Sequence, residues 1–277
     1  MPSQFRRVLL IGKKGSAEIE ASLKELAAFL RKRGCEVVGE GETRADLAIV
    51  IGGDGTMLTA ARDLVRHHVP LVGVNQGRLG FMTDIGQHDM QSGVATILDG
   101  DYSVEERTLL DADIQRQGKS VLRTIALNEA VIGKGSQGRL IEFELSIDGE
   151  FVYRLRADGI IVCTPTGSTA YALSAQGPIL QPTVRAFALV PLNPHVLSAR
   201  PVSVSDSSII ELTLVHALDA RAHFDGFALT DLQQGDRLVL KRSADAIRFV
   251  HPPGYSYFNM LREKLRWSKA VGAKLDD

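Results

Sequence analysis

The amino-acid sequence predicts an α/β domain with a parallel sheet, followed by a β-rich antiparallel domain of sandwich-like architecture. Three observations lead to this fold class. Short apolar runs alternate with helical patterns over residues 1–100, short strand patterns separated by turn residues fill much of residues 101–250, and a helical pattern returns at 255–270. Strands that lack polar alternation and are separated by helices are typical of a parallel sheet covered on both faces.

In the first domain, apolar residues recur at helical spacing over 16–32 and over 57–66. Gly34 follows the first of these segments at the position where glycine commonly ends a helix. The remaining apolar runs are short enough for buried strands. Strands are therefore expected at 8–11, 35–38, 47–51 and 70–74.

The second domain contains a hairpin pattern. The segment "IEFELSI" alternates strictly, the pair Asp148-Gly149 provides a turn, and "FVYRLRA" follows. Four more strands are expected in "IIELTLV", "ARAHF", "DRLVLKR" and "AIRFV". The helical tail has no sheet of its own to cover, so we expect residues 255–270 to pack back on the first domain.

The composition is that of a soluble globular enzyme, with 44% hydrophobic and 23% charged residues. A formal net charge of -1 argues against bulk binding to nucleic acid or to acidic membranes. The apolar run near the N-terminus is too short for a signal peptide or a membrane span. Two cysteines, Cys35 and Cys163, lie in apolar surroundings and indicate a reducing compartment. A cytoplasmic protein is expected.

The glycine-rich segment "IGGDGT" joins the apolar run at 47–51 to the next helical pattern. Open α/β sheets bind ligands at such strand ends, and backbone N–H groups at a helix start favour an anion. Gly52, Gly53, Gly55 and Thr56 are thus candidates for a phosphate loop. The segment is neither a Walker A nor a GxGxxG motif. The alternative is a tight turn in which Thr56 caps the helix with help from Asp54.

A second segment, "TPTGSTAY", follows the apolar run at 160–163. It offers hydroxyl groups from Thr164, Thr166, Ser168 and Thr169, which suit a phosphate or a ribose without adding charge. The alternative is a capped turn between a strand and a helix.

A third candidate is the pair Asn128-Glu129, which is flanked on both sides by apolar residues. A buried amide and carboxylate are unfavourable unless both are hydrogen-bonded, and ribose hydroxyls or an adenine amino group would satisfy them. Asp158 before Gly159 follows the same logic, since its carboxylate can accept from a ribose hydroxyl. A turn at a strand end is the alternative. No role is predicted for His223.

Four segments together resemble the NAD kinase family. They are "GGDGT", "NQGRLGFMTD" at 75–84, the pair Asn128-Glu129, and "DGIIVCTPTGSTAYALSAQGP" at 158–178. The glycine motif also occurs in lipid kinases and, in related form, in phosphofructokinases, whereas the order and spacing of all four fit NAD kinases. The resemblance implies transfer of the γ-phosphoryl group of ATP to the 2′-hydroxyl of the adenosine ribose of NAD, giving NADP.

The resemblance also implies roles for individual residues. Asp54 becomes the candidate general base, with coordination of phosphate-bound magnesium and helix capping as alternatives. Phe227 departs from the family, in which many members have glutamine, and this puts a polar substrate contact there in doubt. The dinucleotide-binding residues implied are Asp54, Gly55, Asn75, Phe81, Asn128, Glu129, Arg139, Arg156, Asp158, Thr169, Ala170, Tyr171 and Ser174.

The expected partners are NAD and ATP, with inorganic polyphosphate as an open alternative donor. Magnesium is expected to arrive with the nucleotide phosphates, because no His and Cys residues have the spacing of a fixed metal site. By resemblance to the family, we expect a homodimer or a homotetramer, in which one face of the alternating segment "IEFELSI" could be buried in a subunit contact. Two other functions stay open from the residues alone: a lipid kinase, and a dinucleotide sensor without catalytic activity.

Overall fold

The computed structural model describes residues 5–13, 15–39, 41–77, 80–136 and 139–267. The chain divides into two compact units. The first comprises Met1–Glu106 and Ile247–Asp277, and the second comprises Arg107–Ala246. Two long strands, β5 (Ser103–Arg116) and β16 (Arg237–His251), each have residues in both units. Across the described ranges, every helix is too short or too polar to span a membrane.

The first unit is built on a parallel sheet with the strand order β2-β1-β3-β4. The end of β16 joins its edge in parallel, where Phe249 pairs with Leu71. All residues of β3 and β4 are buried, as the uninterrupted apolar runs predict. The strands are β1 (Arg7–Gly12), β2 (Glu36–Val38), β3 (Leu47–Ile51) and β4 (Leu71–Val74).

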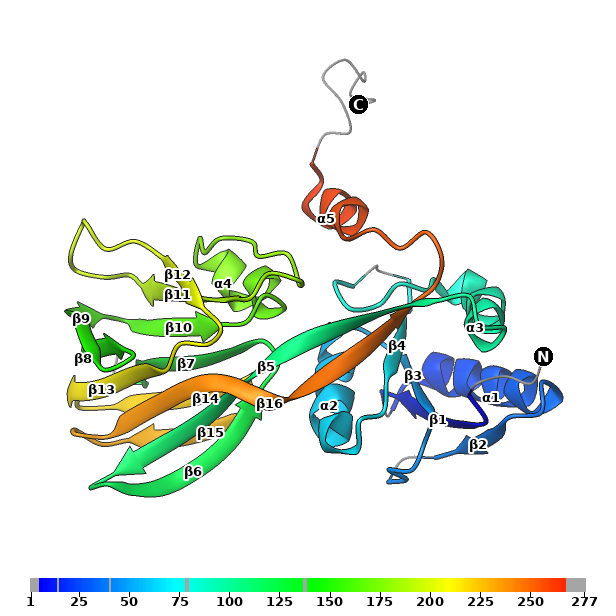
Figure 1. Ribbon diagram of the computed structural model, residues 1–277, viewed down its shortest axis with the longest axis horizontal. Coiled ribbons are helices and arrows are strands. Elements are labelled where there is room, and N and C mark those ends of the chain that lie inside the picture. The colour runs from blue at the N-terminus through cyan, green and yellow to red at the C-terminus, as the bar shows by residue number, and fades with distance from the viewer. Residues whose placement is uncertain (1–4, 14, 40, 78–79, 137–138, 268–277) are drawn as a thin grey trace, which may run out of the picture. The chain divides into compact units, whose positions relative to one another are not determined.

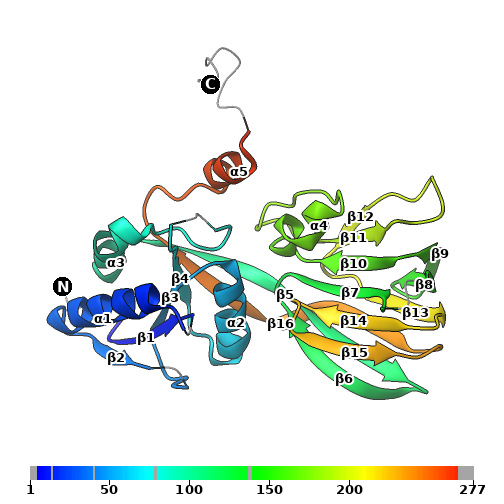
Figure 2. The same ribbon diagram turned by 180° about the vertical axis from the view of Figure 1, so that it is seen from behind.

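Helices cover both faces of this sheet (Figures 1 and 2). Helices α1 (Ala17–Lys32) and α3 (Met90–Leu98) lie on one face, and α2 (Asp54–Leu64) lies on the other. Val8 and Leu10 of β1 join the apolar core under α1 and α3, so the alternate residues of this strand face α2. Short 3₁₀ turns follow at Val65–His67 and Gln87–Asp89, and the last helix of this unit is α5 (Tyr257–Leu265).

The second unit is a sandwich of two sheets. One contains β16-β13-β8-β9, with β5 and β6 on the other side of β16, and the second has the order β12-β11-β10-β7-β14-β15. Phe143, Phe187 and Phe224 are fully buried in the core that the two sheets share. The predicted fold class is confirmed. The strands not yet placed are β6 (Lys119–Ala126), β7 (Glu129–Lys134), β8 (Ile141–Ile147), β9 (Glu150–Ala157), β10 (Gly159–Cys163), β11 (Ala186–Leu192), β12 (Val202–Ser205), β13 (Ile210–His216), β14 (Ala220–Phe224) and β15 (Ala228–Leu232).

Several element boundaries differ from the sequence prediction, and the main differences concern one strand and the start of one helix. The segments "DRLVLKR" and "AIRFV" form one continuous strand, β16, rather than two strands. Helix α2 begins at Asp54 rather than Met57, because Gly53 is its N-cap. The hairpin between β8 and β9 forms as predicted, with positive φ angles of 53° at Asp148 and 83° at Gly149.

Candidate active site

Asp54 is the first residue of α2 and not its cap. Gly53 occupies the N-cap position, and no side chain makes a capping hydrogen bond there. The alternative of a turn capped by Thr56 with help from Asp54 is therefore wrong. Gly52 is buried and its N–H donates to the carbonyl of Val74 at 2.9 Å, whereas Gly53 and Gly55 are exposed.

The Asp54 carboxylate is bound to the loop that follows β4. Its Oδ2 accepts from the N–H of Phe81 at 3.0 Å, and its Oδ1 accepts from the N–H of Met82 at 2.9 Å. A Cβ atom on Gly80 would lie 2.4 Å from Asp54 Oδ1, so only glycine permits this approach. A carboxylate has about four lone-pair positions, so two bonds leave acceptor capacity for a proton. Asp54 thus holds this loop in place and keeps the capacity of a base.

The same loop carries two other predicted residues. Asn75 is buried, and its Oδ1 accepts from the N–H of Gly77 at 3.3 Å. The ring of Phe81 lies 5.2 Å from Nζ of Lys264, a cation–π contact with α5. The positions 78 and 79 of the predicted segment lie outside the described residues.

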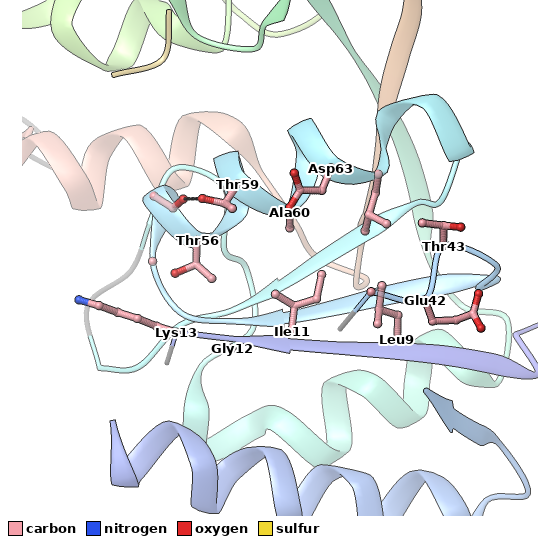
Figure 3. Close-up of a pocket in the computed structure, with 14 residues that line it drawn as sticks. Leu9, Ile11, Gly12, Lys13, Glu42, Thr43, Thr56, Thr59, Ala60 and Asp63 are labelled. Atoms are coloured by element: carbon pink, nitrogen blue, oxygen red, sulfur yellow. Dashed lines mark hydrogen bonds between the residues drawn. The ribbon is translucent and has the colours of Figure 1, made fainter. Parts of the chain in front are cut away.

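A cavity of about 840 Å³ opens beside the glycine motif in the first unit (Figure 3). Gly53, Gly55 and Thr56 line it, together with Lys13 from the loop after β1. Three of the four predicted phosphate-loop residues therefore line one cavity. The fourth, Gly52, is buried beneath Thr56, whose Oγ1 would be 2.6 Å from a Cβ at position 52.

In the second unit, Asp225 holds the Asn128-Glu129 pair. Its carboxylate accepts three backbone N–H groups, from Leu127 at 2.7 Å, Asn128 at 2.7 Å and Glu129 at 3.0 Å. Asp225 has a φ angle of 51° and is followed by Gly226 at 74°, in the turn that joins β14 to β15.

Both side chains of the pair have buried acceptors that no protein group satisfies. Among the described residues, Asn128 Oδ1 and Glu129 Oε2 have no hydrogen-bond partner. Burial, reinforced by the charge of Asp225, raises the pKa of Glu129 to about 8. Buried polar atoms are normally hydrogen-bonded, so these two acceptors fit a ligand that brings donors.

The hydroxyls of "TPTGSTAY" have a different role from the one predicted. Thr164 Oγ1 donates to the carbonyl of Leu127 at 2.5 Å, and Ser168 Oγ accepts from the N–H of Leu180 at 2.9 Å. Thr166 Oγ1 accepts from Arg107 at 3.3 Å. These three hydroxyls are buried and bind the protein itself. The glycine of the motif is also needed for packing, since a Cβ on Gly167 would lie 2.1 Å from the carbonyl oxygen of Asn128.

A second cavity, of about 430 Å³, collects predicted and unpredicted residues of the second unit. Asp158 lines it, with Oδ1 at 2.7 Å from Lys134 Nζ and Oδ2 accepting from Asn193 Nδ2 at 2.9 Å. The hydrogen bond from Lys134 is the main cause that lowers the pKa of Asp158. Its lining residues are Glu129, Val131, Gly133, Lys134, Asp158, Tyr171, Leu192, Asn193, His223, Asp225 and Gly226.

Eight of these residues were absent from the predicted site, and four of the eight have polar side chains: Lys134, Asn193, His223 and Asp225. Burial and the nearby Arg221 lower the pKa of His223, so its ring is neutral at physiological pH and has one donor and one acceptor nitrogen. Sequence spacing could not reveal them, because they come from different strands and loops. The period of two in "ARAHF" does assign His223 to the face opposite the buried Ala222 and Phe224.

Other predicted residues do not line this cavity. Arg139 and Arg156 are exposed, and so is Ser174. Thr169 and Ala170 are half-buried at the start of α4 (Tyr171–Ser174), after the 3₁₀ turn Gly167–Thr169. The side chain of Phe227, at the position where the family pattern is broken, is 49% exposed.

Comparisons with known proteins match two parts of the chain to two family models. The models of the ATP-NAD kinase N-terminal and C-terminal domains match residues 39–102 and 127–252. The chain is 54% identical to an NAD kinase of Aromatoleum aromaticum, over 97% of this chain and 96% of that protein. It is 44% identical to an NAD kinase of Laribacter hongkongensis, over 96% of this chain and 98% of that protein.

Solved structures share the fold. The crystal structure of yeast NADH kinase complexed with NADH aligns with a TM-score of 0.86 at 23% identity, over 98% of this chain and 89% of that one. An NAD kinase from Archaeoglobus fulgidus in complex with ATP aligns with a TM-score of 0.78 at 26% identity, over 94% and 98% of the two chains. The identities over nearly the full length show that this chain belongs to the NAD kinase family, a family of phosphotransferases.

Proposed function

We propose that this chain transfers the γ-phosphoryl group of ATP to the 2′-hydroxyl of the adenosine ribose of NAD and so produces NADP. The observation that carries the proposal is the pair of unsatisfied buried acceptors, Asn128 Oδ1 and Glu129 Oε2. A dinucleotide brings both an adenine amino group and ribose hydroxyls, which are the donors that these atoms require. The names of the relatives, NAD kinase, support the same reaction.

In the proposed mechanism, Asp54 is the general base. The 2′-hydroxyl oxygen attacks the γ-phosphorus, its proton passes to the Asp54 carboxylate, and the bond between the γ-phosphorus and the β–γ bridging oxygen breaks to release ADP. The N–H groups of Phe81 and Met82 fix the orientation of the carboxylate for this transfer. Positioning and charge stabilisation provide most of the catalysis in phosphoryl transfer.

A divalent metal is part of the ATP substrate in this proposal, and magnesium is the ion we propose. Within the described ranges, no three His, Cys, Asp or Glu side chains form a group that could hold a metal. The carboxylate oxygens of Asp54 retain lone pairs that could coordinate a phosphate-bound cation. Hard oxygen ligands from phosphate and carboxylate suit magnesium.

The second-unit cavity is the proposed site of the adenosine half of NAD. Tyr171 is 48% exposed at its edge, which suits stacking or a wall contact. Lys134 and Asn193 already bind the two carboxylate oxygens of Asp158. A hydrogen bond from a ribose hydroxyl to Asp158 therefore has to use the remaining lone pairs of that carboxylate. The further proposed contacts, carried by the family resemblance, are Gly55, Asn75, Phe81, Arg139, Arg156, Thr169, Ala170 and Ser174.

We also propose that the protein is a cytoplasmic homodimer or homotetramer. The apolar face of "IEFELSI" cannot form the subunit contact, because Ile141, Phe143 and Leu145 are buried in the chain's own core. The neighbouring edge strand β9 has exposed Phe151 and Val152, which supports a contact there. Both cysteines are free thiols, which supports a reducing compartment.

The test is incubation of the purified protein with NAD, ATP and magnesium, with product analysis by mass spectrometry and an NADP-specific dehydrogenase. The enzymatic readout distinguishes phosphate on the 2′-oxygen from phosphate elsewhere. We expect NADP and ADP in equal amounts, and no NADP in a matched reaction without ATP. Tight NAD binding without any product would instead indicate a sensor, and it would overturn the proposal.

A further inference from the structure

The segment that binds the Asp54 carboxylate is anchored at its far end to β4. Residues 80–85, here called the return segment, lead back from the loop after β4 to the strand itself. The N–H groups of Asp84 and Ile85 both donate to the carbonyl of Gly73, each at 3.2 Å. The return segment therefore has two anchors, the Asp54 carboxylate near its start and the main chain of β4 at its end.

The return segment is tightly packed between these anchors. Met82 is 5% exposed and Thr83 is fully buried. A Cβ on Gly73 would lie 2.5 Å from the carbonyl oxygen of Met82, so the two main chains are in direct contact. Close-packed interiors transmit strain. A displacement at Asp84 therefore reaches the N–H groups of Phe81 and Met82, two to three residues earlier in the chain.

The side chain of Asp84 is bound by a buried histidine. His251 ends β16 and is 3% exposed. Its Nδ1 lies 2.5 Å from Oδ2 of Asp84, and its Nε2 lies 3.8 Å from Oε1 of Glu105. The imidazole ring stacks on the ring of Tyr255, with the centroids 3.8 Å apart and the planes 8° apart. All four residues belong to the first unit, as does Asp54.

These neighbours determine the proton and the orientation of the His251 ring. Burial lowers the pKa of His251, but the hydrogen bonds and charges of Asp84 and Glu105 outweigh burial and raise it overall. A carboxylate only accepts hydrogen bonds, so Nδ1 carries the proton that is shared with Asp84. The stack on Tyr255 fixes the plane of the ring. His251 thus presents a fixed donor to one carboxylate oxygen of Asp84.

We propose that His251 is a positioning residue for the reaction: it holds the Asp84 side chain and, through the return segment, fixes the two N–H groups that orient the Asp54 carboxylate. The proposal rests on the proposed function, in which Asp54 is the general base. A general base contributes about 10²–10⁴-fold, and a misplacement of about 1 Å can cost about 10²-fold. Loss of the histidine should therefore lower turnover much more than it weakens substrate binding.

The test compares two substitutions of His251 in the single-turnover formation of NADP at saturating NAD and ATP with magnesium. His251→Leu fills much of the same space without a donor, whereas His251→Asn keeps an N–H group at the position of Nδ1. We expect His251→Leu to lower the rate at least about tenfold and to change the steady-state KM of NAD and of ATP by less than about threefold. His251→Asn should recover at least about a third of the wild-type rate. The matched control is His88→Leu, which replaces an exposed histidine of the first unit and should change the rate by less than about twofold.

A double variant separates positioning from a general loss of stability. If His251 acts through Asp54, His251→Leu has little left to change once Asp54→Asn has removed the base. We expect the rate of the double variant to lie within about threefold of the rate of Asp54→Asn alone. A general loss of stability would instead lower the rate by the same factor in both backgrounds. Asp84→Asn, which weakens the charge-assisted bond from the other side, should lower the rate about three- to tenfold, and it provides the test if His251→Leu does not fold.

Three results in variants that circular dichroism shows to be folded would overturn the positioning proposal. The first is a normal rate in His251→Leu or, if that variant does not fold, in Asp84→Asn. The second is a rate of His251→Asn as low as that of His251→Leu, and the third is an equal loss from His251→Leu with and without Asp54→Asn. Each of these results leaves the proposed function intact, because the wild-type protein still forms NADP. A wild-type protein that forms no NADP would instead refute the proposed function itself, and the positioning proposal with it.

Discussion

Replacement of Asp225 by alanine should lower the free energy of unfolding of the second unit and weaken NAD binding. The carboxylate accepts three backbone N–H groups, at 2.7, 2.7 and 3.0 Å. The donors belong to residues that are 2%, 6% and 8% exposed, so water cannot easily replace the lost acceptor. Each hydrogen bond to a charged group contributes about 1.5–3 kcal/mol, and such bonds are not additive when they share one carboxylate.

We therefore expect a loss of about 3–5 kcal/mol in the free energy of unfolding for Asp225→Ala. One effect opposes this loss: the charge of Asp225 helps to raise the pKa of Glu129, so its removal eases the ionisation of Glu129. Asp225→Asn keeps one acceptor oxygen for Asn128 and Glu129 and loses only the partner of Leu127. Its expected loss is about 1–2 kcal/mol.

The assay is urea unfolding followed by circular dichroism, together with calorimetric titration of NAD. The matched control is Asp231→Asn, which changes a carboxylate whose side chain is 83% exposed and should shift stability by less than about 0.5 kcal/mol. We expect the order alanine, asparagine, control for both loss of stability and loss of NAD affinity. An Asp225→Ala protein that unfolds with the control and binds NAD normally would refute the reasoning.

Three further predictions concern titration and assembly. His251 is buried; burial lowers its pKa, but the hydrogen bonds and charges of Asp84 and Glu105 outweigh this and raise it overall. The stabilisation that protonated His251 provides is therefore full below the ordinary pKa of 6.5 and is lost as pH rises through the folded-state pKa. In urea titrations, the stability difference between wild type and His251→Gln should shrink with rising pH. A constant difference would contradict this. NAD affinity should rise with pH up to about 8, because the ligand's donors need ionised Glu129, and Glu129→Gln should remove this dependence in calorimetry; a flat wild-type profile would exclude the carboxylate as acceptor. Phe151→Lys on the edge strand β9 should shift the oligomer toward monomer in light scattering, whereas a stable wild-type monomer of 30.1 kDa would remove the assembly proposal.

The sequence predicted elements well where one periodicity dominated. The buried run at 47–51 became β3, and the turn pair Asp148-Gly149 became the bend of the β8–β9 hairpin. The start of α2 was misplaced because a glycine N-cap leaves no side-chain signal. The length of β16 was missed because Ser243, whose Oγ accepts from the N–H of Asp245, resembles a turn residue in sequence.

The candidate site was predicted only in part. Asn128 and Glu129 were recognised because two polar residues interrupt an apolar strand. Asp225, which accepts from the backbone N–H groups at this pair, lies 96 to 98 residues further along the chain. The sequence gives no information on a contact at that separation. The sequence left open whether the hydroxyls of "TPTGSTAY" bind a ligand or cap a turn, because residue type alone cannot show that Thr164 and Ser168 bind main-chain groups of the protein.

The contacts of Asp54 predict a loss of folding stability for Asp54→Asn. An amide keeps one acceptor oxygen, so one of the N–H groups of Phe81 and Met82 loses its partner. Folding stability should therefore fall by about 1–3 kcal/mol. If Asp54 only capped the helix, as the sequence left open, asparagine would cap it equally well and stability would hardly change. A control for this loosening is Thr83→Val, because Thr83 Oγ1 accepts from the N–H of Gly80 at 2.9 Å in the same loop.

The most direct test of Asp54 as the general base of phosphoryl transfer is the single-turnover rate of NADP formation at saturating NAD and ATP with magnesium. Asp54→Asn should lower this rate by at least ~10²-fold, because the amide cannot take the proton of the ribose hydroxyl. Thr83→Val, which disturbs the same loop and keeps the carboxylate, should lower it by less than about tenfold. Retained turnover in Asp54→Asn, or an equal loss in both variants, would contradict the assignment of Asp54 as the base.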